Sequence, residues 1–508
     1  MLWVGLHLPL LSLESFAATL PHGQSGQPLA LMDAHRIVSA NVCAQALGVQ
    51  PGLKRATALS LAPHLVLGQV DELRDAQALT SAAHAALAFT PAVSLSPPAG
   101  VLLEVQASLR YFGGRESLLK ALRATLAPLG HRVHCVSAPT AQGAALLSRV
   151  HDGLHCADRS SLQRALDAAP VWLLTAGHEH RESLQGMGLH TMGDVRRLPR
   201  SGLARRFGEA LLEELDSTLG ARPDPRDSVV LPPVFHSQLE LFARADTTEQ
   251  VLYGAQVLLA RLIAWLSAKH AFVCRFSLHM KHEPRWRRND VPPCTVLEIA
   301  LAEPSRDAAH LLALLRERLN ALQLPAPTLE LSLHSDDISH QPPPNTELFP
   351  TVQSEHIGLT RLIERLQARL GREQVQRLVP VADHRPERAT AVQPAEPPLL
   401  RARDVTAPRR EDTHSSVPGC TITRPLWLLP QAMALQERQA RPLLEGRALQ
   451  LLTGPERIEA GWWDGDLAER DYFIAQTAEG ALVWLYRARL PLTADTGSEG
   501  WFLQGRFA

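Results

Sequence analysis

The chain has 508 residues, too many for one compact core, so several domains are expected. Hydrophobic residues make up 45% of it and charged residues 20%, which excludes a disordered or fibrous protein. The formal net charge is -1, so any binding site for a polyanion must be a local patch. Six cysteines without a Cys-x-x-Cys spacing indicate reduced thiols in a cytoplasmic protein.

The first twenty residues are apolar but do not have the pattern of a signal peptide. They lack a basic start, and His7, Pro9 and Glu14 interrupt the apolar run. We therefore expect a buried strand followed by a helix. Nowhere does an apolar run approach the roughly 20 residues of a membrane-spanning helix, so we expect no membrane partner.

Strand and helix patterns divide the rest of the chain. Residues 1–165 alternate short apolar runs with Ala/Leu-rich helical stretches, which predicts an α+β multidomain protein. Residues 166–230 have a helical pattern throughout. In residues 231–340 the order strand, long helix, strand, strand, helix, strand predicts one βαββαβ unit. Residues 341–383 contain a proline-flanked segment and a helix with leucines at helical spacing.

The C-terminal part begins with a change of composition. Residues 384–419 are rich in Pro, Arg, Ala and Glu without periodicity, which predicts a flexible linker. Residues 420–508 predict a small β-rich module with a hairpin around Glu479 and Gly480. Its aromatic side chains are expected to form the core of that sheet: Trp462, Trp463, Tyr472, Phe473, Trp484, Tyr486, Trp501 and Phe502.

Several motifs carry a resemblance to a known family. "IVSANVCAQALGVQPGLKRATALSLAPHL", "GVLLEVQASLRYFGG" and "VSAPTAQGAALLSR" resemble motifs of the Y-family translesion DNA polymerases. With "RPLWLL" and "GPERIEAGWWDG" included, the chain resembles the ImuB branch, polymerase-like proteins of bacterial induced mutagenesis that have lost the active site. The resemblance implies palm and fingers in 1–165, a helical thumb in 166–230, a little finger in 231–340 and a partner-binding module at the C-terminal end.

The resemblance also bears on catalysis, because such polymerases hold two Mg²⁺ ions with carboxylates. A register anchored on Glu14 places Gly5 at one metal-binding aspartate. The strand of the second motif places Ala99 and Gly100 at an Asp-Glu pair. These side chains offer no ligand oxygens, so we expect no enzyme activity and no cofactor.

The fingers-like motif and the histidines also bear on whether the chain is an enzyme. Val42 and Gln45 match the Tyr and Arg that contact the incoming triphosphate in the family. An active, low-efficiency polymerase whose ligands have moved to Asp33, Glu104 or Glu14 remains the alternative, as does a DNA-structure-binding protein without polymerase partners. The histidines show no ligand spacing for a structural zinc.

Two basic segments are candidates for contact with DNA. Gly186 and Gly188 in "LQGMGLHTMGDV" predict a helix-hairpin-helix turn whose N–H groups can hold a phosphate, and Arg205 and Arg206 follow it. The segment "HMKHEPRWRRND" combines cations with an aromatic ring, which suits a nucleic-acid backbone: Lys281, Arg285, Trp286, Arg287 and Arg288. A plain helical turn and a solvated hairpin tip are the alternatives.

Two further segments resemble the peptide that docks on the bacterial sliding clamp. "QLELF" (238–242) has the pattern of a strand with Leu239 and Leu241 buried. "NTELF" lies in a proline-flanked segment that can extend into a pocket, so it is the preferred candidate: Asn345, Thr346, Glu347, Leu348 and Phe349. The resemblance implies further partners, namely an error-prone C-family DNA polymerase, an ImuA-type accessory protein and RecA, with nucleoid association when DNA is bound.

Overall fold

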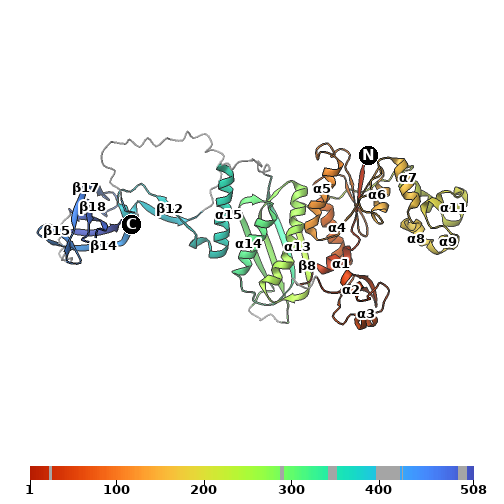
Figure 1. The fold of residues 1–508 in the computed structure, drawn as a ribbon, viewed down its shortest axis with the longest axis horizontal. Coiled ribbons are helices and arrows are strands. Elements are labelled where there is room, and N and C mark those ends of the chain that lie inside the picture. Colours follow the sequence, from red (N-terminus) through yellow and green to blue (C-terminus); the bar gives the residue numbers. More distant parts are fainter. Residues whose placement is uncertain are drawn as a thin grey trace. The chain divides into compact units, whose positions relative to one another are not determined.

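The computed structural model describes residues 1–21, 26–285, 291–340, 352–395, 424–425, 427–489 and 500–507. The chain folds into two compact units, Met1–Arg369 and Leu370–Ala508 (Figure 1). The first unit combines helices with two antiparallel sheets and one mixed sheet, and the second is β-rich. The expected α+β class with an added C-terminal β-rich module is therefore confirmed.

The palm-like part is a four-stranded antiparallel sheet in the order β5-β6-β1-β7. Its strands are β1 (Trp3–His7), β5 (Val93–Ser96), β6 (Gly100–Glu104) and β7 (His134–Ala138). Val4 and Leu6 of β1 pack into a core shared with α4 (Glu72–Leu87) and α5 (Arg115–Leu126). On the other face lies α6 (Ala141–Ser148). The expected N-terminal strand and helix are present as β1 and α1 (Leu11–Ala17).

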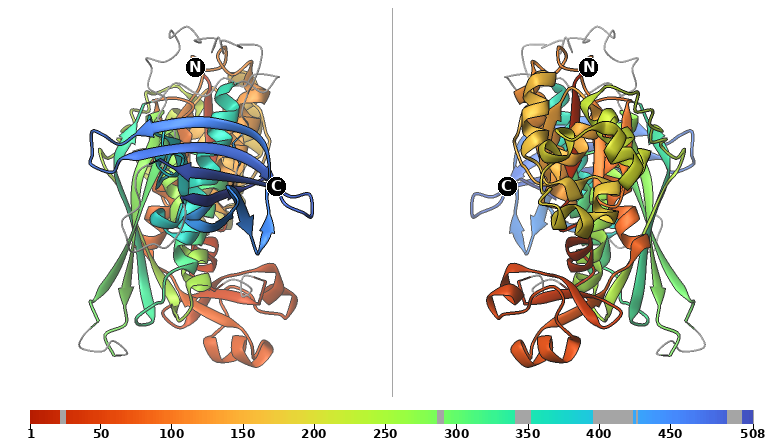
Figure 2. Two further views of the ribbon diagram at one scale, coloured as in Figure 1. Left: turned by 90° about the vertical axis from the view of Figure 1, so that its left-hand side faces the viewer. Right: turned by 90° about the vertical axis from the view of Figure 1, so that its right-hand side faces the viewer.

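The fingers-like part is a smaller three-stranded sheet, drawn in red and orange in Figure 2. It contains β2 (Leu29–Asp33), β3 (Arg36–Ala40) and β4 (Val66–Gln69), with α2 (Val42–Ala46) and α3 (Arg55–Leu61). Asn41 begins α2, because its side-chain oxygen accepts hydrogen bonds from the N–H groups of Ala44 and Leu29. The asparagine of the fingers motif therefore has a structural role here.

The thumb-like part is helical, as expected. It contains α7 (Arg159–Ala168), α8 (Thr175–Glu179), α9 (Arg181–Gly186), α10 (Met192–Arg196), α11 (Arg200–Phe207) and α12 (Glu209–Leu219), with a short 3-10 helix at Val171–Leu173. Leu162 and Leu211 from these helices share one hydrophobic core with Val136 of β7 and Ala144 of α6. The helices therefore pack directly against the palm sheet.

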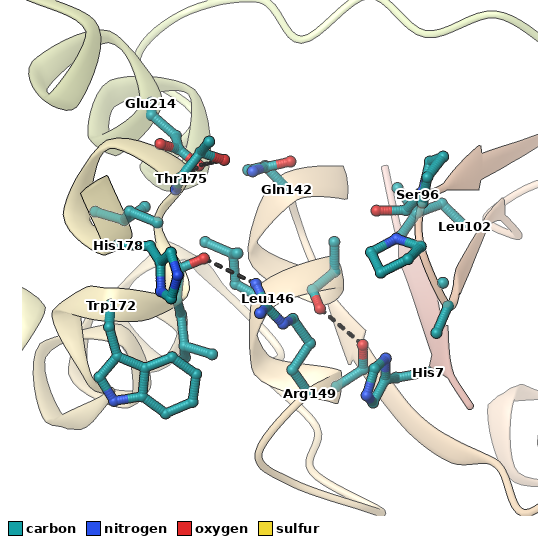
Figure 3. Close-up of a pocket in the computed structure, with 18 of the residues that line it drawn as sticks. His7, Ser96, Leu102, Gln142, Leu146, Arg149, Trp172, Thr175, His178 and Glu214 are labelled. Atoms are coloured by element: carbon teal, nitrogen blue, oxygen red, sulfur yellow. Dashed lines mark hydrogen bonds between the residues drawn. The ribbon is translucent and has the colours of Figure 1, made fainter. Parts of the chain in front are cut away.

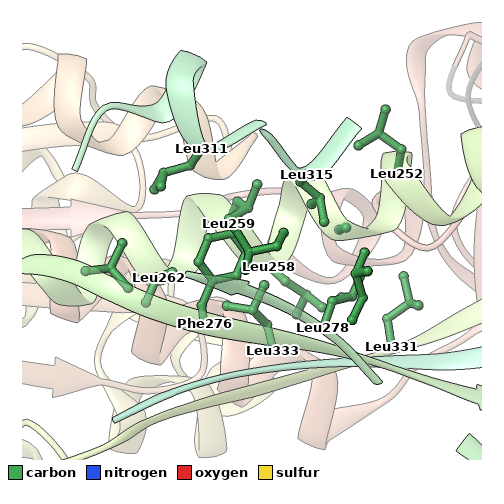
Figure 4. Packing of buried hydrophobic residues seen from close by; sticks show 14 of the residues in the cluster. Leu252, Leu258, Leu259, Leu262, Phe276, Leu278, Leu311, Leu315, Leu331 and Leu333 are labelled. Atoms are coloured by element: carbon green, nitrogen blue, oxygen red, sulfur yellow. The ribbon is translucent and has the colours of Figure 1, made fainter. Parts of the chain in front are cut away.

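The little-finger-like part has the expected βαββαβ order. The strands β8 (Phe235–Ala245), β9 (Phe272–His282), β10 (Cys294–Ser305) and β11 (Thr328–Ser339) form an antiparallel sheet in the order β10-β9-β11-β8. Its core lies between this sheet and the helices α13 (Thr248–Lys269) and α14 (Ala308–Asn320) (Figure 4). A Cβ on Gly254 of α13 would lie 2.7 Å from Leu331, so glycine permits the close approach of helix and sheet.

Helix α13 also meets the length and hydropathy of a membrane span, contrary to the expectation that no run approaches that length. Its apolar residues pack into the core of the little-finger-like part, with Val251, Leu258, Leu262 and Trp265 all fully buried. Its position in the described part of the chain is that of a core helix.

Helix α15 (Val352–Leu370) follows the little-finger-like part. Thr360 and Glu364 of this helix are buried, and the Glu364 carboxylate lies 2.8 Å from the imidazole of His310 in α14. The leucines predicted to lie at helical spacing are present, but Leu359, Leu362 and Leu366 face outward and are 47%, 52% and 37% exposed.

The C-terminal unit contains a seven-stranded antiparallel sheet in the order β16-β15-β14-β20-β19-β18-β17, drawn in blue in Figure 2. The strands are β14 (Trp427–Arg438), β15 (Arg441–Leu444), β16 (Arg447–Ala448), β17 (Gln450–Ala460), β18 (Ala468–Gln476), β19 (Leu482–Ala488) and β20 (Trp501–Arg506). The hairpin expected around Glu479 and Gly480 joins β18 to β19. Most of the expected aromatic core is buried or half-buried, including Tyr472, Trp484 and Trp501.

The prediction that Trp462 and Trp463 belong to that core is wrong. They lie in the turn between β17 and β18, where Trp462 is 77% exposed and Trp463 is 52% exposed, and their rings meet edge to face. A turn residue does not follow the in-and-out alternation of the strands on either side, so an apolar side chain there need not be covered.

The predicted start of the flexible linker at residue 384 is also wrong. Residues 376–394 form a hairpin of β12 (Gln376–Pro380) and β13 (Thr390–Pro394). In its loop, Arg385 is buried and donates to the carboxylates of Asp383 and Asp464, with Nη2 2.7 Å and 2.6 Å from their oxygens. A buried guanidinium is stable when carboxylates satisfy its donors, so this charged stretch is part of the folded unit.

Candidate functional site

The principal candidate site is a cavity of about 460 Å³ in the first unit, next to the end of β1 (Figure 3). The palm-like part contributes His7 of β1, Ala99 and Gly100 at the β5–β6 hairpin, and Arg149 just after α6. The thumb-like part contributes Trp172, Leu173, Leu174, Thr175, His178, Glu179 and Glu214. Palm and thumb side chains therefore meet around one polar cavity.

Two residues of β1, Gly5 and His7, differ in how they lie relative to the cavity. Gly5 points at α6, and a Cβ there would lie 2.3 Å from the carbonyl oxygen of Ala144. In this structure no side chain fits at residue 5 without moving α6. His7 lines the cavity and is paired with Gly100 across the sheet. Gly5, which was matched to a metal-binding aspartate, therefore does not line the cavity, and His7 two residues further along does.

Ala99 and Gly100, which were matched to the Asp-Glu pair, lie at this cavity. Both line the cavity beside His7, and the N–H of Leu8 donates to the carbonyl oxygen of Ala99 at 2.8 Å. A Cβ on Gly100 would lie 2.7 Å from the carbonyl oxygen of Ser96. The tight hairpin itself therefore leaves no room for a side chain at residue 100.

The electrostatics of the cavity are unfavourable to a cation on the β1 side. Burial and the nearby Arg149 guanidinium lower the pKa of His7 to about 4, so its imidazole is neutral at physiological pH. Arg149 donates to the carbonyl oxygen of Leu173 at 2.9 Å and brings a permanent positive charge. On the thumb side, Glu214 accepts from the N–H of Thr175 at 2.9 Å and caps α8.

The carboxylates considered as displaced metal ligands lie elsewhere. Glu104 stands at the opposite end of β6, where it pairs with Trp3, while His7 pairs with Gly100. Four residues of strand separate the two positions by about 13 Å. Glu14 accepts from the N–H of Arg132 at 3.0 Å. Asp33 ends β2 in the fingers-like part. They do not converge on the cavity.

A second cavity, of about 630 Å³, lies between the palm-like and fingers-like parts. Its lining is mostly apolar and includes Leu11, Val38, Val70 and Leu79. Val42 is exposed on α2, and Gln45 donates to the carbonyl oxygen of Ala40 at 2.8 Å. These residues carry no charge that could neutralise a triphosphate. Within the described ranges, no cluster of three or more His, Cys, Asp or Glu residues could hold a metal ion.

The predicted helix-hairpin-helix turn joins α9 to α10. Gly188 has a φ of +76°, which favours glycine, and Thr191 caps α10 through the N–H of Asp194. Gly186 ends α9, and both Arg205 and Arg206 are exposed on α11.

Three other arginines follow the glycine turn and already have carboxylate partners: Arg196, Arg197 and Arg200. Arg196 binds Asp167, with Nη2 2.7 Å from Oδ2, and Arg200 binds Asp216 at 2.6 Å. An arginine already paired with a carboxylate offers less to a phosphate, because that ion pair must first break. Arg205 and Arg206 are therefore the better candidates for an anion contact.

The basic segment of the little-finger-like part is only partly described. Lys281 lies on β9, and its Nζ is 2.9 Å from the Glu330 carboxylate on β11. Arg285 is exposed in the turn that follows. Trp286, Arg287 and Arg288 lie outside the described residues. Because Lys281 already has an anionic partner, it is a weaker candidate for a phosphate contact than the prediction implied.

The two clamp-like segments differ in what the structure describes. "QLELF" lies in β8, as predicted: Leu239 is 3% exposed, Leu241 packs against the same core, and Phe242 meets Phe16 edge to face. The preferred segment, residues 345–349, lies outside the described residues.

Three site features were not anticipated from the sequence. Arg149, Trp172 and His178 line the principal cavity although they come from separate elements. Arg149 is the last residue of "VSAPTAQGAALLSR". The direction in which its side chain points depends on how α6 packs on the sheet. The exposed tryptophan pair was visible as "GWW" and was assigned to the core.

Comparisons with known proteins found similar sequences and similar solved structures. No protein-family profile matches the chain. It is 29% identical over 474 residues to Protein ImuB of two Caulobacter vibrioides strains, covering 91% of this chain and all of each relative. Solved structures similar to it include an insertion ternary complex of Dbh DNA polymerase and DinB from Sulfolobus solfataricus. The Dbh complex is 15% identical, with a TM-score of 0.38, and the match covers 67% of this chain and 100% of that one. DinB is also 15% identical, with a TM-score of 0.36, and the match covers 66% of this chain and 99% of that one. The resemblance to ImuB is confirmed.

Proposed function

We propose that this ImuB-like chain is a non-catalytic adaptor in translesion DNA synthesis. It binds DNA and the sliding clamp, and it recruits an error-prone C-family DNA polymerase during damage-induced mutagenesis. The observation that carries the proposal is the composition of the cavity at the end of β1. His7, Ala99 and Gly100 line it on the palm side, so that side supplies no carboxylate.

Two-metal catalysis of nucleotide transfer needs several oxygen ligands around two Mg²⁺ ions about 4 Å apart. A neutral imidazole is a poor ligand for Mg²⁺, which prefers oxygen. The Arg149 guanidinium adds a repulsive charge. The carboxylates of Glu14 and Glu104 accept from the backbone N–H groups of Arg132 and Gln106, away from the cavity. The palm side of the cavity is therefore unsuited to a pair of divalent cations, and the two carboxylates that line the cavity, Glu179 and Glu214, come from the thumb side.

The test is single-nucleotide incorporation on a primer-template with Mg²⁺ and, separately, Mn²⁺. We expect no extension by protein purified away from host polymerases. A mock purification from cells without the gene measures contaminating activity. Extension that follows the protein through gel filtration and exceeds the mock would establish the alternative, an active polymerase with displaced ligands.

DNA binding is supported by the exposed Arg205 and Arg206 on α11, which follows the glycine turn of α9 and α10 in the sequence. Arg285 of the little-finger-like part is a separate candidate contact, and the neighbouring candidates at 286–288 lie outside the described residues. Phosphate contacts release counterions, so binding is largely independent of base sequence and weakens with salt.

The clamp contact is assigned to Asn345, Thr346, Glu347, Leu348 and Phe349. An extended peptide is needed for the clamp pocket, and "QLELF" is unavailable because it is a strand of the folded core. The C-terminal module is assigned to an ImuA-type accessory protein and RecA, in a cytoplasmic protein that associates with the nucleoid. Its exposed Trp462 and Trp463 support a role in partner binding, because tryptophan is enriched in interface hot spots.

Pull-down with purified clamp and C-family polymerase separates this adaptor from a plain DNA-binding protein. The intact chain should retain both partners. A variant that ends before the C-terminal module should keep the clamp and lose the partners bound by the module. Failure of the intact chain to retain either partner would contradict the adaptor proposal.

A further inference from the structure

Helix α15, labelled in Figure 1, is attached to the first unit by its less apolar side. Thr360, Glu364 and Ala368 follow each other at intervals of four residues, and Ala368 packs against the little-finger core. Glu364 accepts from the N–H of Ala302 and lies 2.8 Å from the imidazole of His310. These buried contacts hold the helix in one orientation, which fixes what its other sides present.

The side that faces outward is apolar. We call Leu359, Leu362 and Leu366 the leucine seam. They are each more than a third exposed, and their spacing of three and four residues places them in one line along the helix. The line is about 10 Å long, two helical turns. A single exposed leucine is ordinary, but a contiguous seam on a rigid helix is the pattern of a recognition surface.

A row of arginines runs beside the leucine seam. Arg361, Arg365 and Arg369 also recur every four residues, and all three are exposed. Arg361 lies 3.0 Å from Asp307, at the start of α14. This arrangement of a leucine line flanked by cations resembles half of a coiled-coil interface, with apolar seam positions and charged flanking positions.

We propose that the leucine seam and the adjacent arginine row bind an acidic amphipathic helix of another protein. The occupant must supply apolar side chains at seam spacing, since the leucines are otherwise left in water. It must also carry carboxylates opposite the arginines. A second copy of this chain fits poorly: packed antiparallel, it would bring a second arginine row against the first, and packed parallel, it would place the uncharged Ile363 and Gln367 opposite the arginines. The inference does not depend on DNA or clamp binding.

The probe is a synthetic 21-residue helical peptide, fluorescently labelled, with leucine at the seam positions of each heptad and glutamate at the flanking positions. An otherwise identical peptide carries lysine in place of glutamate. Fluorescence anisotropy with the full chain should show binding of the acidic peptide, weakened by salt, and at least about tenfold weaker binding of the basic peptide.

The first variant changes Leu359, Leu362 and Leu366 to serine. It should lower affinity for the acidic peptide at least about tenfold. The matched control changes three other exposed apolar residues of the same unit, Val42, Leu61 and Leu73, to serine and should leave affinity unchanged. The charge reversal Arg365→Glu with Arg369→Glu should transfer the preference to the basic peptide.

Each remaining outcome overturns the proposal. Equal binding of both peptides means that charge does not select the partner, and binding that survives the leucine variant means that the seam is not the site. A dimer that sedimentation detects in the wild type and not in the leucine variant identifies a second copy as the occupant. A melting temperature that falls in the leucine variant and not in the control means that the seam is covered within the chain. A failure in these assays leaves the clamp and extension results unaffected.

Discussion

The two clamp-like segments predict opposite phenotypes when their apolar residues are shortened. In the first double variant, Leu239→Ala and Leu241→Ala, the changes fall in β8. Leu239 is 3% exposed and lies in the core between the sheet and α13, where its methyl group approaches the position of Gly254. A buried leucine changed to alanine costs about 2–5 kcal/mol, because transfer free energy is lost and a cavity remains.

Leu241 is only partly buried, so its own change belongs at the lower end of that range. The two residues share neighbours around Gly254, so their effects are not strictly additive. The double variant should lose about 4–6 kcal/mol of unfolding free energy. At about 2–4 °C per kcal/mol for a large domain, its melting temperature should fall by on the order of 10 °C or more.

In the second double variant, Leu348→Ala and Phe349→Ala, the melting temperature should stay unchanged. As hot spots entering a clamp pocket, these residues should together contribute about 2 kcal/mol or more, about thirtyfold in affinity. Calorimetry measures the melting temperature, and surface plasmon resonance measures clamp binding. If the second variant still binds the clamp while the first stays folded and does not, the clamp peptide has been assigned to the wrong segment.

Three further predictions follow from named contacts. For DNA binding, the double variant Arg205→Ala with Arg206→Ala should reduce the salt dependence of affinity by about 1–2 counterions. Lys281→Ala should change it less, because Lys281 pairs with Glu330. A larger effect of Lys281→Ala in a salt titration would contradict this ranking. For pH dependence, burial lowers the pKa of His84 to about 4, below its unfolded value of about 6.5. The contribution of the neutral His84 to the free energy of unfolding is therefore complete above pH 6.5 and is lost as pH falls towards 4. Denaturant unfolding should show a loss of about 3 kcal/mol in that window that is missing in His84→Gln, and identical pH slopes would refute the assignment. For metal binding, the double variant His7→Asp with Ala99→Asp should bind Mn²⁺, which electron paramagnetic resonance detects. Gly100→Glu should instead lower the melting temperature, because a Cβ at residue 100 would lie 2.7 Å from the carbonyl oxygen of Ser96. A Gly100→Glu protein as stable as the wild type would refute the steric argument.

The order of the elements could be read from the sequence because it depends on local periodicity. The alternation along β1 and the long apolar stretch of α13 are carried by adjacent residues, and the βαββαβ order followed from them. The burial of Leu239 in β8 followed from the same alternation. That Ala99 and Gly100 carry no carboxylate was also visible, since it depends only on which residues occupy a motif.

What only the tertiary structure decided is the direction in which particular side chains face. Alternation puts Gly5 and His7 on the same face of β1, but the position of α6 covers Gly5 and leaves His7 at the cavity. Helical spacing groups Leu359 with Leu362, but the buried pair of Glu364 and His310 turns that side of α15 outward.

The C-terminal unit shows the same division. A stretch of Pro, Arg and Glu predicts a linker by composition, yet Arg385 is buried because Asp464, far along the chain, supplies a carboxylate. Trp463, next to Asp464 in the turn between β17 and β18, stays half exposed although its large aromatic side chain predicts a core position. Burial depends on contacts between residues distant in sequence, and periodicity contains no information about which distant segment supplies the partner.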